Sequence, residues 1–424
     1  LQSTGLNVGQ ADPAAAGLSK GTLPSASLRA QSALVMPNTI SNAVPPLGTV
    51  KNLVVLMRFS DQVGRTPPSV ADIDTLMNSP VPVAGIAPSG SVRGVYSENS
   101  YGQMTLESTV ATWVVLPNTE AYYANGNSGL TSRTHEALRA ALDLVDALPG
   151  IDFDDFDTDN DNQIDSITFL HSGYAAEFGG TDAYGTNYVN RMWSHRWSIG
   201  GGWTSSSGVQ VSDYHISPAV WGTSGNALGR IGVISHETGH FFGITDLYDS
   251  DSSGGEGIGS WGMMANSWGF DGTQYCPPHF SPWSKIELGW TTPTVISNPG
   301  QYALNEVEFN AEIFRIDTGF PNNEYLLIEN RQPSGFEYCM PQGGLVIWHI
   351  DDDATYNNEG YPGQAGWPGN ANHYRVAVLQ ADGNYNLEKG NNRGDSGDPH
   401  HAAGVDAIGP GPGGHPNTDT YQGG

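Results

Sequence analysis

The chain has 424 residues, enough for one large or two medium domains, and its 38% hydrophobic and 10% aromatic content excludes global disorder. Its 17 basic against 44 acidic side chains give a formal net charge of -27. That balance argues against nucleic acid as a partner, because phosphate binding needs a basic face. No run of about 18 apolar residues occurs, so we expect no membrane span.

The first half of the chain begins with a stretch that lacks periodicity. Residues 1–47 are rich in Ala, Ser, Pro and Gly, which is typical of an extended arm or the remnant of a pro-segment. The apolar run 50–59 predicts a buried strand, and residues 92–116 predict loop, turn and strand. Residues 132–148 place their apolar side chains on one face behind a Thr-Ser cap, which predicts an amphipathic helix.

The second half mixes short helices with strands. Asn226 is expected to cap a helix over 227–242. Further strands are predicted at 166–171, 209–216, 325–331, 343–350 and 374–381, and a short helix at 282–288. There is no internal repeat and no lasting alternation of strands with long helices. We therefore predict an α+β fold rather than a doubly wound sheet.

Residues 236–246 read His-Glu-Thr-Gly-His-Phe-Phe-Gly-Ile-Thr-Asp. His236 and His240 lie four apart on the predicted helix, so both imidazoles can reach one ion. Glu237 can face a water on that ion, which zinc acidifies toward a pKa of about 7, and can take its proton as general base. A chance occurrence on a helix surface is the competing interpretation, and the longer pattern makes it the weaker one.

Two features follow the histidines. Gly243 permits a sharp turn that can bring Asp246 back as a third zinc ligand; otherwise Asp246 is a turn residue bonded to backbone. Met263 or Met264 can form the Met-bearing turn of metzincin-type peptidases, or each can be an ordinary core methionine.

An acidic loop precedes the predicted strand at 166–171. Oxygen ligands at alternate positions suit calcium, and the loop resembles an EF-hand loop with Asn162 in place of the usual glycine. A solvated acidic loop is the alternative. The predicted calcium ligands are Asp157, Asp159, Asp161, Gln163 and Asp165.

A second acidic segment lies near the C-terminus. Asp382, Glu388, Asp395 and Asp398 form a weaker candidate for another calcium site. The tripeptide 393–395 and the Gly-Asp-Ser-Gly at 394–397 imitate an integrin motif and a serine-protease nucleophile segment. We interpret both as chance, since no matching catalytic histidine segment occurs upstream.

The two cysteines, Cys276 and Cys339, can form one disulfide or remain two buried thiols. The chain begins at Leu1 and not at Met, so we expect that a signal peptide has been removed and that the protein is secreted.

With these residues in view, the chain resembles the immune inhibitor A family of secreted bacterial metallopeptidases. The resemblance runs from about residue 50 to 383, through VVLMRFSD, ENSYGQMTL, DTDNDNQID, HETGHFFGITDLYD, SPWSKIELGW, LLIENRQ, GGLVIWHID and VLQADG. It implies a zinc endopeptidase that also binds calcium, with zinc on His236, His240 and Asp246 and Glu237 as base. Ile244-Thr245 departs from the more usual Leu-Pro of the family.

The sequence therefore predicts a secreted, monomeric zinc endopeptidase that acts on proteins or peptides, with Zn²⁺ as catalytic and Ca²⁺ as structural ion. We expect a metzincin-like catalytic domain at 48–290 and a β-rich portion packed on it at 291–424. Substrate is expected to pair with an edge strand near 205–217. The alternatives are a calcium-stabilised secreted binding protein with an inactive zinc site and, more weakly, a zinc amidase with a non-peptide substrate.

Overall fold

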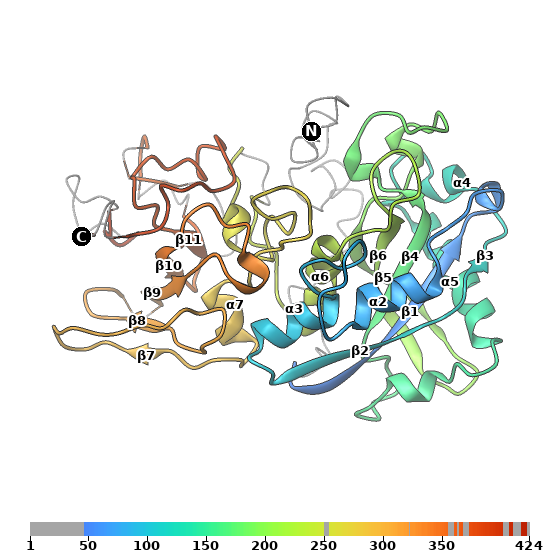
Figure 1. Cartoon of the computed structure of the whole chain (residues 1–424), viewed down its shortest axis with the longest axis horizontal. Helices are drawn as coiled ribbons and strands as arrows, with labels where there is room; N and C mark the ends of the chain where they lie inside the picture. The colour runs from blue at the N-terminus through green and yellow to red at the C-terminus, as the bar shows by residue number, and fades with distance from the viewer. Residues whose placement is uncertain are drawn as a thin grey trace. The chain divides into compact units, whose positions relative to one another are not determined.

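The computed structural model describes residues 46–249, 254–321, 323–354, 360–362, 364–367, 373–401, 407–409 and 417–421. The chain forms two compact units, unit 1 (Leu1–Ser97 and Met104–Gly243) and unit 2 (Glu98–Gln103 and Ile244–Gly424). Their elements are labelled in Figure 1. The predicted arm at 1–47 lies outside the described residues except for its last two. The two units are defined by compactness and not by function. The domain boundary expected at residue 290 therefore stays a prediction.

Unit 1 contains one sheet with helices between its strands. The strands are β1 (Gly48–Arg58), β2 (Met104–Val110), β3 (Val114–Val115), β4 (Ile167–Tyr174), β5 (His195–Thr204) and β6 (Gln210–Val220). The α-helices are α2 (Val70–Asn78), α3 (Val92–Asn99), α4 (Glu120–Ala124), α5 (Ser132–Asp146) and α6 (Ile231–Gly239). Short 3₁₀ turns are η2 (Ser60–Gln62), η3 (Phe153–Phe156), η4 (Ala176–Phe178), η5 (Tyr188–Asn190) and η6 (His240–Phe242).

The sheet of unit 1 has the order β2-β1-β4-β6-β5, with β3 paired to the end of β1. All pairs are parallel except β5 with β6. The strand order reverses between β1 and β4, because the chain adds β2 on one side of β1 and then β4 on the other. The expected edge strand near 205–217 is wrong, since β6 lies between β4 and β5; the edge strand on this side of the sheet is β5.

Helices α5 and α6 pack on opposite faces of this sheet. Successive strand residues point to opposite faces, so the neighbours His215 and Ile216 of β6 diverge. Ile216 joins a core cluster with the apolar stripe of α5, including Leu138 and Leu142, both fully buried. His215 faces the other way, toward Thr238 of α6. The helix predicted at 132–148 is confirmed as α5, with Thr131 as its cap.

Unit 2 is mainly β-structure. Its strands are β7 (Thr294–Val295), β8 (Phe314–Ile316), β9 (Glu324–Arg331), β10 (Gly344–Asp351) and β11 (Val376–Val378), beside α7 (Pro282–Glu287), η7 (Gly259–Trp261) and η8 (Gly335–Glu337). The sheet order is β11-β10-β9-β8-β7, antiparallel except for the parallel pair β7–β8. The strands predicted at 325–331 and 343–350 and the helix at 282–288 are confirmed within a residue. The strand predicted at 374–381 is shorter.

The segment Glu98–Gln103 belongs to unit 2 although unit 1 surrounds it in sequence. Glu98 Oε1 lies 2.8 Å from Nε2 of the fully buried His279. The backbone N–H of Phe280 donates to Asn99 Oδ1 at 2.9 Å. These contacts lie inside unit 2, which is therefore built from two separate stretches of chain.

Mixed sheets with few helices make this a mixed α/β chain. Two local predictions are wrong: residues 92–99 form helix α3, not a loop, and α6 begins later than residue 227. None of the helices among the described residues has the length and apolar character to cross a membrane.

Candidate metal centre

Helix α6 begins at Ile231 because the residues before it are tied to the end of β6. Val220 and Leu228 form an isolated bridge, and the N–H of Gly229 donates to Ala219 O at 2.7 Å. A Cβ at Gly229 would lie 2.7 Å from Pro218 O, so this close approach requires glycine. The backbone is thereby held away from helical geometry, which explains why Asn226 does not cap the helix.

The helix is fixed to the sheet by polar contacts on its buried side. Thr238 Oγ1 donates to Ile234 O at 2.7 Å and lies 3.1 Å from His215 Nε2. The same ring nitrogen lies 2.8 Å from Thr168 Oγ1 of β4. Burial lowers the pKa of His215 to about 3, so this imidazole is neutral. A buried hydroxyl–imidazole–hydroxyl chain therefore sets the rotation of α6 on the sheet.

A second support comes from α3. The hydroxyl of Tyr96 donates to Ser235 O at 2.5 Å, and its ring meets Phe242 edge-on with centroids 5.5 Å apart. Tyr96 is fully buried. It fixes the helix at the residue just before His236. The sequence predicted a loop at residues 92–99, so this contact was not expected.

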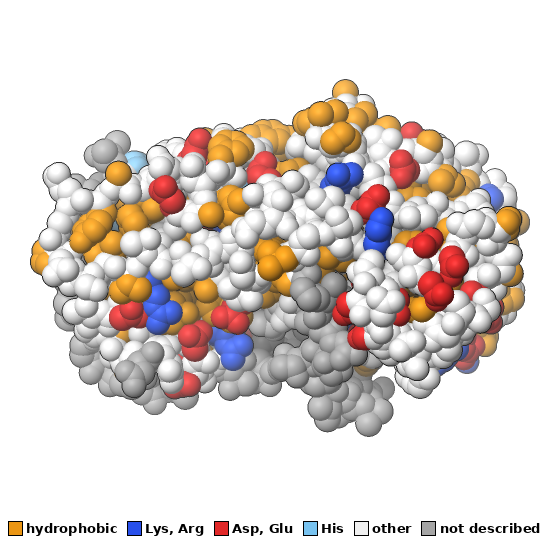
Figure 2. Space-filling model, turned by 90° about the horizontal axis from the view of Figure 1, so that it is seen from below, with side chains coloured by type: hydrophobic (Ala, Val, Ile, Leu, Met, Phe, Trp, Pro, Cys, Tyr) orange, Lys and Arg blue, Asp and Glu red, His pale blue; other side chains and the backbone are white. Residues whose placement is uncertain are grey.

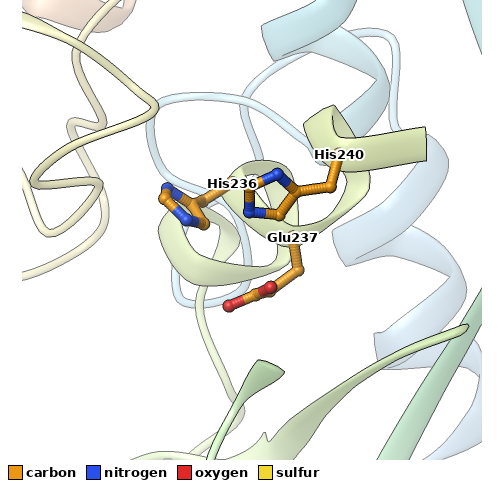
Figure 3. A group of neighbouring side chains, drawn as sticks. All are labelled: His236, Glu237 and His240. Atoms are coloured by element: carbon orange, nitrogen blue, oxygen red, sulfur yellow. The ribbon is translucent and has the colours of Figure 1, made fainter. Parts of the chain in front are cut away.

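His236, Glu237 and His240 lie together at the C-terminal end of this anchored helix. One ligand atom from each lies within 4.8 Å of the others. The two imidazole rings have centroids 5.1 Å apart and are nearly perpendicular, and Figure 3 shows them side by side with the Glu237 carboxylate close by. His236 and Glu237 are each 1% exposed and His240 is half-buried. Two imidazoles and a carboxylate on rigid backbone fit the donor types that zinc takes.

The chain turns directly after the second histidine. Gly243 ends η6 in the left-handed conformation with φ 83°, and its N–H donates to His240 O at 3.2 Å. The predicted turn at glycine is thus present. Asp246 follows three residues later, is half-buried, and belongs to unit 2. Its role as a zinc ligand stays a prediction.

The part of the chain that contains α6 is similar in sequence to known peptidases. Residues 86–290 match the family described as Immune inhibitor A peptidase M6, catalytic domain. This range is therefore similar to the catalytic domain of the immune inhibitor A peptidases. The matched range includes all of α6 and the residues through Asp246.

Curated relatives of this peptidase domain come from two bacteria. "Immune inhibitor A" of Bacillus thuringiensis subsp. alesti is 32% identical over 220 residues, which is 45% of this chain and 30% of the relative. "Pre-pro-metalloprotease PrtV" of Vibrio cholerae serotype O1, from strains M66-2 and ATCC 39315 / El Tor Inaba N16961, is 26% identical over 288 residues, 59% of this chain and 28% of the relative. The alignments thus span less than a third of each relative's length.

The acidic loop of unit 1 lies between η3 and β4. Asp157, Asp159 and Asp165 offer carboxylate oxygens within 4.8 Å of one another. Asp165 is 3% exposed, and burial is the largest cause of its raised pKa, with Asp159 and Asp157 adding to it. Asn162 adopts φ 64°, the left-handed conformation expected at the position where a calcium loop usually has glycine.

The backbone of this loop wraps around its first aspartate. Asp157 accepts the N–H groups of Asp161 at 3.0 Å and Asn162 at 3.0 Å. Gln163 Nε2 donates to Gln210 Oε1 of β6 at 3.2 Å, and Gln163 Oε1 accepts from Ser212 Oγ at 3.1 Å, so the predicted calcium contribution of Gln163 falls to its backbone carbonyl. The structure thus brings together three of the five predicted residues; the group does not include Asp161.

The second acidic segment, in unit 2, is less concentrated. A Cβ at Gly397 would lie 2.6 Å from Asp382 Oδ2 and 3.0 Å from Asp395 Oδ1, so these two carboxylates flank one glycine. Asp398 is buried and accepts the indole N–H of Trp261 at 2.8 Å. Within the described part of the chain, these carboxylates and Glu388 do not form a group with ligand atoms within 4.8 Å.

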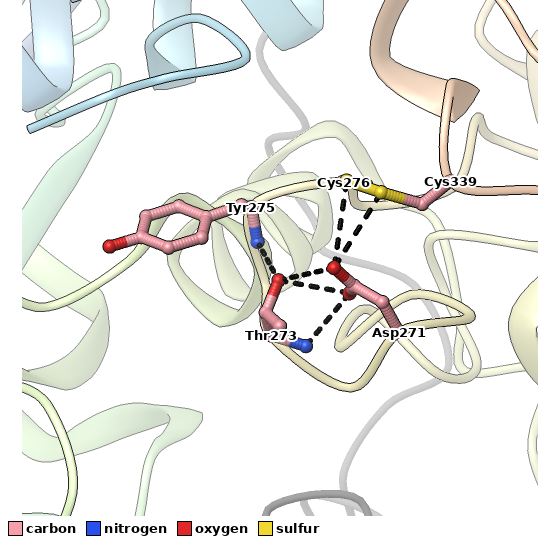
Figure 4. The surroundings of a disulfide bond; sticks show 5 residues. All are labelled: Asp271, Thr273, Tyr275, Cys276 and Cys339. Carbon is pink, nitrogen blue, oxygen red and sulfur yellow. Dashed lines mark hydrogen bonds between the residues drawn. A yellow bond between two sulfur atoms is a disulfide. The ribbon is translucent and has the colours of Figure 1, made fainter. Parts of the chain in front are cut away.

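The methionines and cysteines also lie in unit 2. Met263 and Met264 are buried, and Leu247, next to Asp246, donates its N–H to Met264 O at 2.8 Å. Cys276 and Cys339 are joined as a disulfide beside Asp271, as Figure 4 shows. Because the sulfurs are bonded to each other, they are not thiolate ligands for a metal.

Proposed function

We propose that the chain is a secreted zinc endopeptidase that hydrolyses peptide bonds in proteins. The observation that carries this proposal is the group His236, Glu237 and His240, whose ligand atoms lie within 4.8 Å of one another on an anchored helix of the matched peptidase domain. The relatives support it, since one of them bears the name metalloprotease.

The two histidines would hold the ion, and Asp246 is the proposed third ligand. When bound, zinc supplies Lewis acidity, which acidifies water and polarises a peptide carbonyl. The buried Thr238–His215–Thr168 chain and Tyr96 keep α6 from rotating, so the imidazoles are oriented before the ion binds. Such preorganisation lowers the entropic cost of assembling the site.

Glu237 is the proposed general base. Its carboxylate lies on the same helical turn as both imidazoles and is almost fully buried. A carboxylate there can take a proton from the attacking water and pass it to the leaving amine. The proposed protein substrate would pair with the edge strand β5, in place of the internal region first expected.

Calcium is proposed as a structural ion in the loop of Asp157, Asp159 and Asp165. Three carboxylates this close repel one another, and a divalent cation would relieve that repulsion while taking further backbone oxygens. The segment with Asp382, Asp395 and Asp398 is proposed only as a weaker second site. We further propose that the protein acts as a monomer outside the cell.

The test is hydrolysis of casein by the purified chain and by the variant Glu237→Gln. We expect the variant to retain one equivalent of zinc and to lose at least about three orders of magnitude in kcat/KM. Glu136→Gln changes an exposed glutamate of α5 and should leave the activity unchanged. A chelator should abolish wild-type activity and zinc should restore it.

Activity that survives in Glu237→Gln would disprove the assignment of the base. A wild-type chain that holds zinc but cleaves neither casein nor short peptides would favour the alternative, a calcium-stabilised binding protein.

A further inference from the structure

A cavity of about 320 Å³ lies in unit 1 at the carboxyl ends of β1, β4 and β6. Arg58 is the last residue of β1, Tyr174 the last of β4 and Val220 the last of β6, and all three line it. These strands are parallel, and the strand order reverses between β1 and β4. In open sheets the loops diverge at such a reversal and leave a crevice that binds ligands.

The walls of this cavity are polar and aromatic. It is lined by Arg58, Gln62, Gly64, Arg65, Thr66, Pro67, Ser172, Tyr174, Tyr184, Val220, Gly225 and Asn226. The lining of the cavity contains two cationic side chains and no carboxylate. This is unusual in a chain with 17 basic and 44 acidic residues, whose surface in Figure 2 shows acidic side chains in many places and basic ones in few.

The Arg58 side chain is held by backbone carbonyl groups. Its Nε donates to Gln62 O at 3.3 Å and its Nη2 to Val63 O at 2.7 Å, both neutral acceptors. Over the part of the chain that the structure describes, Nη1 makes no hydrogen bond and no carboxylate pairs with this guanidinium. Arg58 is thus an oriented cation with donors to spare.

Arg65 is oriented by an aromatic ring. Its guanidinium carbon lies 3.7 Å from the centroid of the Tyr184 ring, within the range of a cation–π contact. Its guanidinium, too, has no hydrogen bond or ion pair with any described residue. Tyr184 stacks on Tyr174 with centroids 6.2 Å apart and planes at 21°. The Tyr174 hydroxyl donates to Gly225 O at 2.6 Å, which fixes this aromatic wall.

The floor of the cavity adds no negative charge. Ser172 Oγ donates to Gln62 Oε1 at 2.5 Å, and Gln62 Nε2 donates to Glu120 Oε2 at 2.7 Å. Burial raises the pKa of Glu120 to about 8, so this carboxyl is mainly neutral at pH 7. Asp182 is nearby in sequence, but its carboxylate accepts the N–H groups of Tyr184 and Thr186 and does not line the cavity.

We propose that this cavity binds a small organic anion whose carboxylate or phosphate group is held by Arg58 and Arg65 and whose flat part lies against Tyr174 and Tyr184. Guanidinium groups offer paired N–H donors that match both oxyanions. The volume is at the lower end of ligand cavities, which run from about 300 to 1,000 Å³, so the ligand is the size of one amino acid or sugar phosphate. The lining contains no residue of the His236–His240 group, so this site is separate from the proposed hydrolytic one.

Calorimetric titration of the full-length chain tests the proposal with three probes: N-acetyltyrosine, its uncharged amide, and inorganic phosphate. We expect at least one of the two anions to bind, with an affinity that falls as salt rises, and the amide to bind at least tenfold more weakly than N-acetyltyrosine. Binding of N-acetyltyrosine alone would assign carboxylates, and binding of phosphate alone would assign phosphate esters.

The variant Arg65→Gln separates this cavity from the metal sites, which could also attract anions. The Arg65 side chain makes no hydrogen bond with described residues, so its replacement should leave the fold intact and weaken anion binding at least tenfold. Arg133→Gln is the matched control, because Arg133 also lies over a tyrosine ring, Tyr122, at 4.7 Å. The proposal is overturned if neither anion binds the wild type, or if both arginine variants bind equally well.

Discussion

His236, Glu237 and His240 of the proposed metal site lie in the same unit as the anion cavity, but the two groups are built in opposite ways. These three residues fall within five consecutive positions at the end of α6 and the start of η6. The cavity draws residues from Arg58 to Asn226, at the ends of three strands and in the loops beyond them. The comparison shows that a site formed within one helical turn can be recognised from the spacing of its residues in the sequence. A site formed at the ends of several strands cannot, because its residues come together only through the strand order of the sheet.

The largest expected effect tests the metal site of this comparison. His240→Ala removes one imidazole, so we expect loss of bound zinc and a fall in kcat/KM of at least about three orders of magnitude. Metal analysis and casein hydrolysis measure both. His135→Ala, in the same unit but outside the group, is the control and should keep the zinc; full activity in His240→Ala would show that the helical pair is not the site.

The acidic loop is a second locally encoded group, and its expected effect is on stability. The double variant Asp157→Asn, Asp159→Asn removes two carboxylates and should abolish stabilisation by calcium. At a free calcium concentration of 100 times Kd, that stabilisation is about 2.7 kcal/mol. Thermal unfolding with calcium and with chelator measures it, with Asp74→Asn as control. If wild type and double variant respond equally to calcium, the ion binds elsewhere.

A pH effect tests the packing around strand β4. This strand contributes Thr168 to the polar contacts that hold α6 and Ser172 to the lining of the cavity. Burial lowers the pKa of His171 to about 3, and neither of its ring nitrogens has a partner among the described residues. In the unfolded chain this imidazole takes up a proton near pH 6.5, while in the folded chain it stays neutral. The contribution of neutral His171 to the free energy of unfolding is therefore fully present above pH 6.5 and is lost as the pH falls toward 3.

His171→Phe removes this titration in a side chain of similar shape. The difference in the free energy of unfolding, wild type minus variant, should fall by up to about 1.4 kcal/mol per pH unit below pH 6.5. Denaturant unfolding between pH 4 and 8 measures it. A difference that does not change with pH would contradict the buried neutral state.

The smallest expected effect tests whether Tyr96, which is far in sequence from α6, helps to hold the helix of the proposed metal site. Tyr96→Phe deletes the hydrogen bond to Ser235 O and should cost about 1 kcal/mol of stability. Because the helix would be less firmly held, we also expect a modest loss of zinc affinity. Tyr122→Phe, an exposed tyrosine bonded to Glu136, is the control. Unchanged stability and affinity would mean that packing alone fixes α6.

Local patterns predicted much of the fold and the core of the proposed site. The apolar stripe gave α5 to within two residues, and the strands of unit 2 followed from their apolar runs. The start of α6 was wrong because a bridge between Val220 and Leu228 overrides the capping preference of Asn226. No sequence period records such a contact between separate segments.

Other parts were out of reach because they depend on pairing between distant strands. The parallel order β2-β1-β4-β6 could not be derived from strands alone, and the interior place of β6 overturned the expected edge. The supports of α6, Tyr96 and the Thr238–His215–Thr168 chain, lie up to 139 residues from their partners. Buried polar residues in apolar runs, such as Thr168 and His215, were the available signal.

The segment Glu98–Gln103 limits how this protein can be taken apart. No single cut yields both units, since unit 2 takes six residues from the middle of the sequence of unit 1. A fragment starting at Ile244 would lack Asn99, which accepts the N–H of Phe280, and Glu98, which contacts His279 and the N–H of Phe336. Recombination with a relative would therefore need three junctions, at 97/98, 103/104 and 243/244, and a transplanted unit 2 must bring this short insert with it.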